Sequence, residues 1–312
     1  MENPIPWPNG AKCACAITFD MDADSLIHIS RPADSHKRLY PISMGRYGPT
    51  VAIPRILATY KRLGLKQSFF VPAWCLEHYP ETIEKILSDG HEIGHHGFLH
   101  EDPVETDGEQ RMWFEKALAS HQKICGGKPR GYRAPVYNAT DTTVDLLIEH
   151  GFAYDSSLMA DDIPYLIQTP TGQLWEMPVH WGTDDWPPFA HYAEIDYMMP
   201  VQSPSAGLAG FSEEFEAQSE AGGFFMLILH PFLTGRLARW RLVEKWLEST
   251  LDDRNVWFAP LGDIVDHVQD ITTSGAYAPR VEHLPYFDGP IDPRAATERA
   301  MLTGSTDLGR IQ

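Results

Sequence analysis

Short apolar runs alternate along the chain with longer segments whose apolar residues recur at helical spacing. The runs that predict strands are 13–20, 68–73, 91–96, 131–134, 153–156, 175–181, 224–230 and 256–260. The segments that predict helices are 51–63, 80–89, 109–125, 140–150, 212–221, 237–249 and 261–268. This alternation indicates an α/β fold with a parallel sheet, and seven or eight repeats favour a barrel over an open sheet.

Polar residues fall where these predicted strands end. They are Asp20, Asp22, His96, Arg133, Asp155 and His230. In a βα barrel the active site is built at the carboxyl ends of the strands. We therefore expect these side chains to share one site.

Two segments interrupt the pattern, a polar one at 25–49 and a long, aromatic-rich one at 182–210, and both are predicted to be loops. Loops of this length in a compact domain are usually functional, so they are candidate walls of a substrate pocket; a contact between copies of the chain is the alternative. We expect one barrel domain over residues 1–275 and a C-terminal arm or tail over 276–312.

Composition narrows the function. The 312 residues are 43% hydrophobic, enough for a packed core, and the formal charge of −18 argues against binding nucleic acid or an anionic membrane. The first ten residues have neither a basic residue nor an apolar core, so no signal peptide is expected. No apolar run approaches the length of a membrane span. These features predict a cytoplasmic protein with four buried thiols, and a homo-oligomer is expected.

Four histidines lie within residues 90–100 and form two His-x3-His pairs. Strand alternation places His91 and His95 on one face and His96 on the other. His96 ends the strand, and His100 follows after a turn that a glycine permits. We expect His96 and His100 to bind a metal, and His91 and His95 to make structural hydrogen bonds.

Asp20 and Asp22 share a face of the first strand, so one can bind the metal while the other acts as a base. Two histidines and one carboxylate form an open site for a divalent ion. Arg133 can form a bidentate pair with one aspartate or an ordinary structural salt bridge. His230 is a lone histidine, which is more often structural than acidic.

Four motifs, in order over residues 13 to 265, resemble those of the NodB-homology polysaccharide deacetylases, carbohydrate esterase family 4. Thr18-Phe19-Asp20-Met21-Asp22 resembles the first motif, Thr-Phe-Asp-Asp, and the segment from His96 to His100 resembles the second. Arg133-Ala134-Pro135 resembles the third, and Leu227-Ile228-Leu229-His230 the fifth. The Asp-x-Asp form of the first motif is similar to a subgroup of intracellular peptidoglycan-deacetylase-like proteins, cyclic imide hydrolases and metal-independent allantoinases.

The resemblance implies a distorted (β/α)7 barrel and a role for each motif residue. The implied metal ligands are Asp22, His96 and His100, and the ion is usually zinc. Asp20 would be the general base with Arg133 as its partner, and His230 the general acid. The implied substrate-binding residues are Tyr137, Asp185 and Trp186.

Two motifs depart from the family pattern. Val136 stands where the third motif has an aromatic residue, which Tyr137 can replace. The fourth motif is matched only approximately, by Asp184-Asp185-Trp186.

The sequence thus predicts a metal-dependent hydrolase of a non-peptide C–N bond. Its substrate is either an N-acetylated sugar or a small cyclic imide or ureide, and the aromatic loop and missing export signal favour the small molecule. A metal-free variant of the reaction and an inactive barrel that only binds a metal or ligand are the alternatives.

Overall fold

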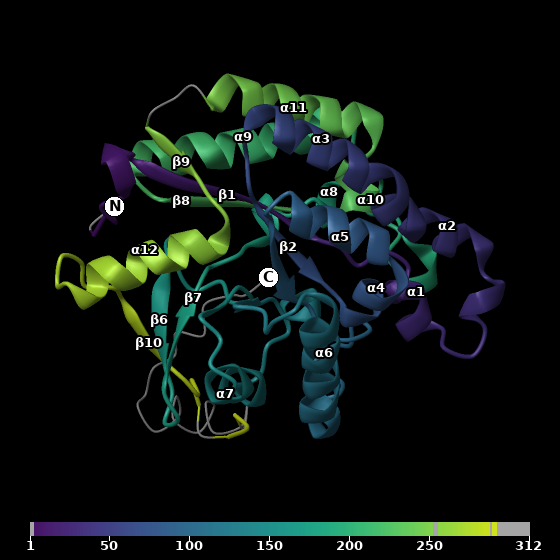
Figure 1. Cartoon of the computed structure of the whole chain (residues 1–312), viewed down its shortest axis with the longest axis horizontal. Coiled ribbons are helices and arrows are strands. Elements are labelled where there is room, and N and C mark those ends of the chain that lie inside the picture. Colours follow the sequence, from purple (N-terminus) through teal and green to yellow (C-terminus); the bar gives the residue numbers. More distant parts are fainter. Residues whose placement is uncertain (1–2, 252–254, 288, 292–312) are drawn as a thin grey trace, which may run out of the picture.

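Seven parallel strands form the wall of a barrel in the computed structural model, which describes residues 3–251, 255–287 and 289–291. In spatial order they are β7 (Gln173–Glu176), β5 (Tyr154–Asp155), β4 (Gly131–Tyr132), β3 (Glu92–His95), β2 (Ser68–Val71), β1 (Cys13–Asp20) and β8 (Phe224–Leu229). Helices cover the outside of this wall (Figure 1).

The barrel is closed irregularly. Strands β7 and β8 are the ends of the parallel series, and between them the chain makes an isolated parallel bridge from Asp184 to Ile228. The backbone N–H of Asp185 donates to the carbonyl oxygen of Ile228 at 3.0 Å. This bridge holds the segment after β7 against the last strand, as expected of a distorted (β/α)7 barrel.

The sheet is mixed at one edge, so the prediction of an entirely parallel sheet was wrong there. Strand β6 (Tyr165–Gln168) pairs antiparallel with β7, and β10 (Val281–His283) pairs parallel with β6. β6 alternates buried and half-buried positions and is too short for an apolar run to reveal it. β10 lies beyond residue 275, so the described part of the predicted tail adds a strand to the sheet; residues 292–312 lie outside the described residues.

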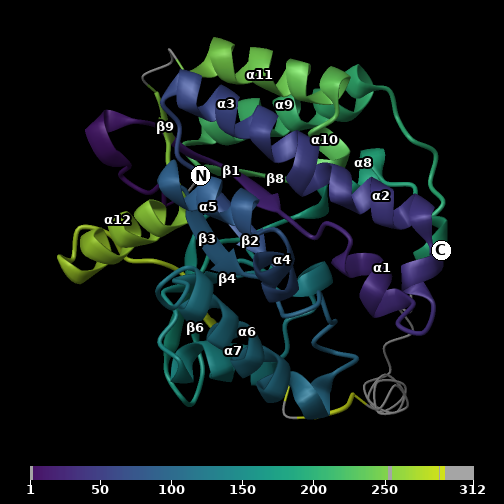
Figure 2. The same ribbon diagram turned by 45° about the vertical axis from the view of Figure 1, so that its right-hand side comes forward.

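The remaining strand, β9 (Val256–Phe258), pairs with the first half of β1. Helices follow most strands, and those outside the two predicted loops are α3 (Ile53–Leu63), α4 (Ala73–His78), α5 (Pro80–Ser88), α6 (Gln110–Ile124), α7 (Asp141–Glu149), α9 (Pro204–Ala221), which begins inside the second of these loops, α10 (Pro231–Thr234), α11 (Leu237–Thr250) and α12 (Leu261–Thr273). In Figures 1 and 2, α3, α9 and α11 lie together as one layer over β1 and β8. No helix in the described ranges has the length and apolar character needed to cross a membrane.

The two segments predicted to be loops contain helices, which corrects that expectation. The first holds α1 (Ser25–Ser30) and α2 (Leu39–Tyr47), and the second holds α8 (Trp186–Phe189) and the first turns of α9. The helices α1 and α8 are too short to show helical periodicity. The start of α9 is set by a local cap, since the Ser203 hydroxyl accepts from the N–H of Ala206 at 3.3 Å.

Alternation along β1 determines which side chains reach the site. Cys15 and Phe19 face the helices, where Phe19 packs against Trp240 at 6.0 Å between ring centroids. Ala14 and Ala16 face the barrel interior. Asp20 is in register with these inward residues, so the strand presents its carboxylate at the carboxyl end of the barrel.

The cysteines are all free thiols. Cys13, Cys15 and Cys75 are buried as expected, whereas Cys125 is partly exposed because it follows the end of α6.

Candidate functional site

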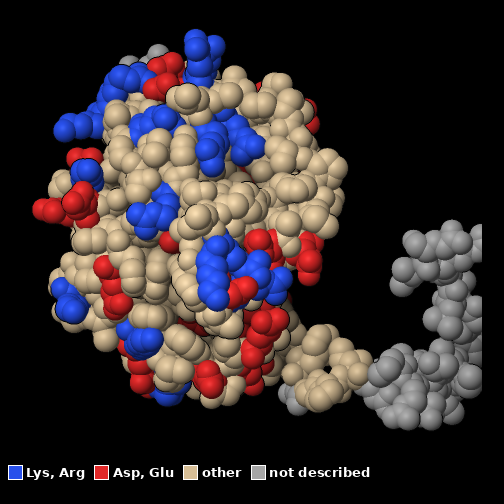
Figure 3. Space-filling view, turned by 90° about the vertical axis from the view of Figure 1, so that its right-hand side faces the viewer, with Lys and Arg blue, Asp and Glu red and all other residues tan. Residues whose placement is uncertain are grey.

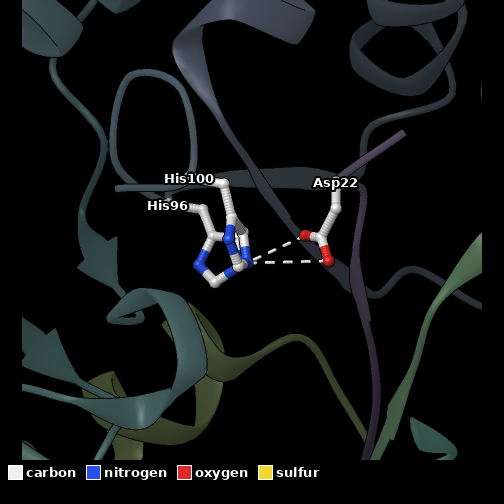
Figure 4. Close-up of side chains that lie close together, drawn as sticks. All are labelled: Asp22, His96 and His100. Atoms are coloured by element: carbon white, nitrogen blue, oxygen red, sulfur yellow. Dashed lines mark ion pairs between the residues drawn. The ribbon is translucent and has the colours of Figure 1, made fainter. Parts of the chain in front are cut away.

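Asp22, His96 and His100 meet at the carboxyl ends of β1 and β3. The Nε2 atom of His96 lies 3.4 Å from Oδ1 of Asp22, and Nε2 of His100 lies 3.6 Å from Oδ2. Figure 4 shows both imidazoles pointing at the carboxylate. The chain reverses between the two histidines at Gly97, whose φ of +72° favours glycine.

Hydrogen bonds behind the histidines fix how they face the site. The Nδ1–H of His96 donates to the carbonyl oxygen of Arg133 at 2.7 Å, which leaves Nε2 as the lone-pair nitrogen. The turn before His100 is held by Glu101, whose carboxylate accepts from the N–H groups of Phe98 and Leu99 at 2.7–3.0 Å. The cluster is therefore preorganised.

The three side chains fit a divalent cation. One ligand atom from each lies within 4.8 Å of the others. Asp22 is 1% exposed, and its Oδ1 atom is buried without a hydrogen-bond partner, which an ion at this point would supply. Burial raises the pKa of Asp22, but the neighbouring histidines His100, His96 and His230 outweigh it and lower the pKa to about 2.

The other histidine pair makes structural hydrogen bonds. Nδ1 of His91 accepts from the N–H of Gln67 at 3.1 Å, and Nδ1 of His95 accepts from the N–H of Gly97 at 3.0 Å. Both rings pack among aromatic side chains on the helix side of β3. They are thus directed away from the cluster.

Asp20 lies beside the cluster and is paired with Arg133. Nη1 of Arg133 donates to Oδ1 of Asp20 at 2.6 Å and to the Thr18 hydroxyl at 3.0 Å, while Nε and Nη2 donate to the carbonyl and hydroxyl oxygens of Ser156. The pair uses one nitrogen and is not bidentate, because Ser156 takes the other two. Oδ2 of Asp20 remains directed at the site, 4.0 Å from Nε2 of His96.

His230 lies on the other flank of the cluster. Its Nδ1–H donates to Oδ1 of Asp185 at 2.7 Å, and its Nε2 lies 3.5 Å from Oδ2 of Asp22. Burial lowers the pKa of His230, but the hydrogen bond and charge of Asp185, with Asp22 and Asp184, outweigh it and raise the pKa to about 10. The ring is therefore held with Nε2 toward the cluster and Nδ1 toward Asp185.

The structure does not place Asp185 in the substrate pocket, contrary to expectation. Its side chain is fully buried, and both oxygens accept hydrogen bonds from His230 or from the hydroxyl of Thr234. Asp184 faces the cavity in its place. Adjacent residues in an extended segment point to opposite sides, so the sequence could not tell which aspartate faces the pocket.

A cavity of about 90 Å³ opens above the cluster. Besides Asp20, His230 and the three residues of the cluster, its walls are Leu26, Ala134, Val136, Tyr137, Trp181, Asp184, Trp186 and Ile195. Tyr137 and Trp186, which the resemblance implies to bind substrate, both line it. The Tyr137 hydroxyl donates to Asp184, whose pKa is raised by burial to about 6 despite the opposing charge of His230.

The wall at Val136 and Tyr137 is conformationally strained. Their φ values are 49° and 62°, which is a rare conformation for a β-branched or aromatic residue. Strain of this kind costs about 1–3 kcal/mol per residue and is concentrated at functional sites. This conformation could not be predicted from the sequence, because a Pro-Val-Tyr segment is not a typical left-handed turn.

Behind Arg133, two buried carboxyl groups support its anchor. Oε1 of Glu176 accepts from the N–H groups of Ser157 and Leu158 at 2.9 and 3.0 Å, and the Ser157 hydroxyl donates to Oδ1 of Asp155 at 2.7 Å. The remaining carboxyl oxygens have no other partner. Burial, then the charge of Asp155, raises the pKa of Glu176 well above its usual value, so folding favours its protonated form.

This pair predicts a pH-dependent stability. Because the folded-state pKa of Glu176 is raised above 4.5, its contribution is complete below that pH and is lost as the pH rises, by up to about 1.4 kcal/mol per pH unit. Glu176→Gln should remove this loss and be as stable as the native chain, or more stable, at pH 8. Urea unfolding from pH 4 to 9 measures it, with exposed Glu216→Gln as control. Parallel curves for Glu176→Gln and the native chain would contradict the raised pKa of Glu176.

The fold and the cluster together define a barrel enzyme, with its chemical groups at the carboxyl ends of the strands. Comparison with known proteins identifies its family. Residues 47–154 match the family model described as polysaccharide deacetylase. The chain is 27% identical to a peptidoglycan deacetylase of Helicobacter pylori, over 72% of this chain and 86% of that protein. It is 33% identical to a peptidoglycan deacetylase-like protein of Gibberella zeae, over 64% of this chain and 70% of that protein.

Solved structures agree. A Mycobacterium smegmatis protein assigned as a polysaccharide deacetylase superposes with a TM-score of 0.85 at 34% identity, covering 91% of this chain and 98% of that one. An allantoinase shares the fold, with a TM-score of 0.73 at 21% identity over 88% and 94% of the two chains. The chain belongs to the polysaccharide deacetylase family, and it is a hydrolase of carbon–nitrogen bonds other than peptide bonds. The resemblance, the fold class and the enzyme class predicted from the sequence are thereby confirmed.

Proposed function

We propose that the chain is a zinc-dependent amidohydrolase in which Asp22, His96 and His100 hold the ion. The observation that carries this proposal is the arrangement of two hydrogen-bonded pairs around one cluster of three potential metal ligands. Asp20 with Arg133 flanks His96, and His230 with Asp185 flanks Asp22. Two imidazoles and one carboxylate are a donor set that zinc accepts with a position left open.

The chain's own residues supply the proton transfers. A divalent ion bound here would lower the pKa of water and polarise an acyl oxygen. Asp20 takes one proton from the attacking water, whose oxygen forms a bond to the acyl carbon. As the C–N bond breaks, Nε2 of His230 gives its proton to the nitrogen, because an amine leaves poorly as an anion. An N-acetylated sugar gives acetate and an amine, whereas a cyclic imide or ureide gives one ring-opened acid that keeps its amide or urea nitrogen. The proton on Asp20 restores His230 through solvent.

Arg133 and Asp185 act through these two groups. Arg133 keeps Asp20 turned toward the cluster, and its own charge is compensated although the guanidinium is fully buried. Asp185 fixes the tautomer of His230 so that Nε2 carries the transferable proton.

For the substrate we favour a small cyclic imide or ureide. The cavity is small and largely apolar, whereas a polymer needs an open groove. An N-acetylated sugar is the second candidate, because two curated relatives are named as a peptidoglycan deacetylase and a similar protein.

Hydrolysis assays separate the two. The zinc-loaded protein is expected to open succinimide, hydantoin or allantoin and to release no acetate from chitooligosaccharides, as measured by mass spectrometry. Acetate release without ring opening would reverse the substrate assignment. Failure to hydrolyse any of them would contradict the proposed function.

A further inference from the structure

The two segments that the sequence singled out as possible pocket walls meet above the site. Leu26, on α1, and Ile195, at the end of the short helix η7 (Ala193–Ile195), both line the cavity and pack in one hydrophobic cluster. In Figure 2 the chain between α8 and α9 runs beside α2 and α1. We call this pair of segments, 25–38 and 190–199, the roof.

The roof is tied together by an ionic latch. Nη1 of Arg38 donates to Oε2 of Glu194 at 2.5 Å, and Nε of Arg31 lies 4.0 Å from the same oxygen. Arg38 is itself oriented by Asp34, which accepts from its Nε and Nη2 at 3.0 and 2.8 Å. The Glu194 side chain is only 19% exposed. Figure 3, which faces the side where α1 and α2 lie, shows acidic and basic side chains close together on this surface.

The part of the roof that carries Ile195 is also closed on itself. The N–H of Tyr192 donates to the carbonyl oxygen of Tyr197 at 2.6 Å, and the reverse bond is 3.1 Å long. Asp196 makes the turn with a φ of 59°. Tyr197 packs its ring against Trp186, another wall of the cavity, at 5.8 Å. Ile195 is therefore held over the cavity by a closed turn and a latch.

The charges of the cavity add a second restriction. Its lining includes the carboxyl groups of Asp20, Asp22 and Asp184 and contains no lysine or arginine. A substrate carboxylate directed at Asp184 would meet repulsion there. The positive charge of His230 is already paired with Asp185, and that of a bound ion would be faced by Asp22. Neutral amides that donate N–H groups suit this lining.

We propose that the roof restricts the site to small neutral amides, with Ile195 as the specificity-determining side chain and the Arg38–Glu194 pair as its support. This inference rests on the proposed function for the identity of the reacting bond. It adds which residues exclude bulky or anionic substrates. In an apolar pocket, space for one methylene group more or less changes the discrimination between two substrates by roughly 10–200-fold.

Binding measurements test the roof apart from catalysis. Isothermal titration calorimetry on the zinc-loaded protein would compare hydantoin with 5-phenylhydantoin, which is bulkier, and with hydantoin-5-acetic acid, which is anionic. The native chain should bind hydantoin at least about tenfold more tightly than either. Ile195→Ala and Glu194→Gln should reduce the ratio of the affinity for hydantoin to that for 5-phenylhydantoin. The corresponding ratio for hydantoin-5-acetic acid should stay unchanged. Met198→Ala, an exposed change in the same segment, should alter neither ratio.

Equal binding of the three compounds by the native chain, no binding of hydantoin, or an unchanged phenyl ratio in both roof variants would overturn the proposal. Turnover of hydantoin by the same samples is read separately. Ring opening with an unchanged ratio would reject the roof alone, and a narrowed ratio without ring opening would reject the proposed function alone.

Discussion

His96→Ala is expected to lose both the bound metal and the activity. The substitution removes one of three ligands and leaves Asp22 with fewer partners inside a buried site. Because a catalytic metal supplies several kcal/mol of charge stabilisation in the transition state, turnover should fall by about 10³-fold or more. Elemental analysis and steady-state kinetics on the same preparation measure the two effects.

His91→Ala is the matched control, since this histidine belongs to the competing His-x3-His pair and bonds to the backbone of Gln67. It should lower thermal stability and keep the metal. Loss of metal in His91→Ala with retention in His96→Ala would show that the wrong pair has been assigned. A fully active His96→Ala protein would exclude a metal-dependent reaction.

Asp20→Asn should keep the metal and lose turnover. The amide oxygen can still accept from Nη1 of Arg133, but it cannot take a proton from water. Removal of a general base typically costs 10²–10⁴-fold, and we expect a kcat loss of about this size. Stopped assays at saturating substrate measure kcat, and metal content is measured alongside.

Because Arg133 would then be buried without a full counter-charge, Asp20→Asn must be checked for folding by circular dichroism and thermal unfolding. Asp22→Asn is its counterpart and should lose the metal instead. If Asp20→Asn loses the metal and Asp22→Asn keeps it, the two roles are exchanged.

Much of the fold could be predicted from the sequence, because the parallel strands of a covered barrel are nearly continuous apolar runs. The predicted limits of β1 were Cys13 and Asp20, and the structure has the same limits. Short elements escaped prediction. β6 and α8 have four residues each, too few for either periodicity to be visible, and their conformation depends on the neighbouring β7 and on the gap beside β8.

The candidate metal ligands could be predicted, because histidines at the carboxyl end of a barrel strand are typical of a metal site. His96 ends the predicted strand, and His100 follows after a turn at a glycine. The structure brings both together with Asp22. What could not be predicted depends on contacts distant in sequence. One example is that Asp184, and not Asp185, lines the cavity. The Arg38–Glu194 latch, which joins residues 156 positions apart, is another.

Metal stoichiometry is the most direct test of a zinc-dependent hydrolase. Purified native chain, His96→Ala and Asp20→Asn would be stripped with a chelator, reloaded with zinc, dialysed and analysed for metal, with activity on the small imides recorded for each. The account predicts about one equivalent in the native chain and in Asp20→Asn, almost none in His96→Ala, and turnover only in the native chain. Full activity of the stripped native chain, or equal zinc in all three proteins, would contradict it.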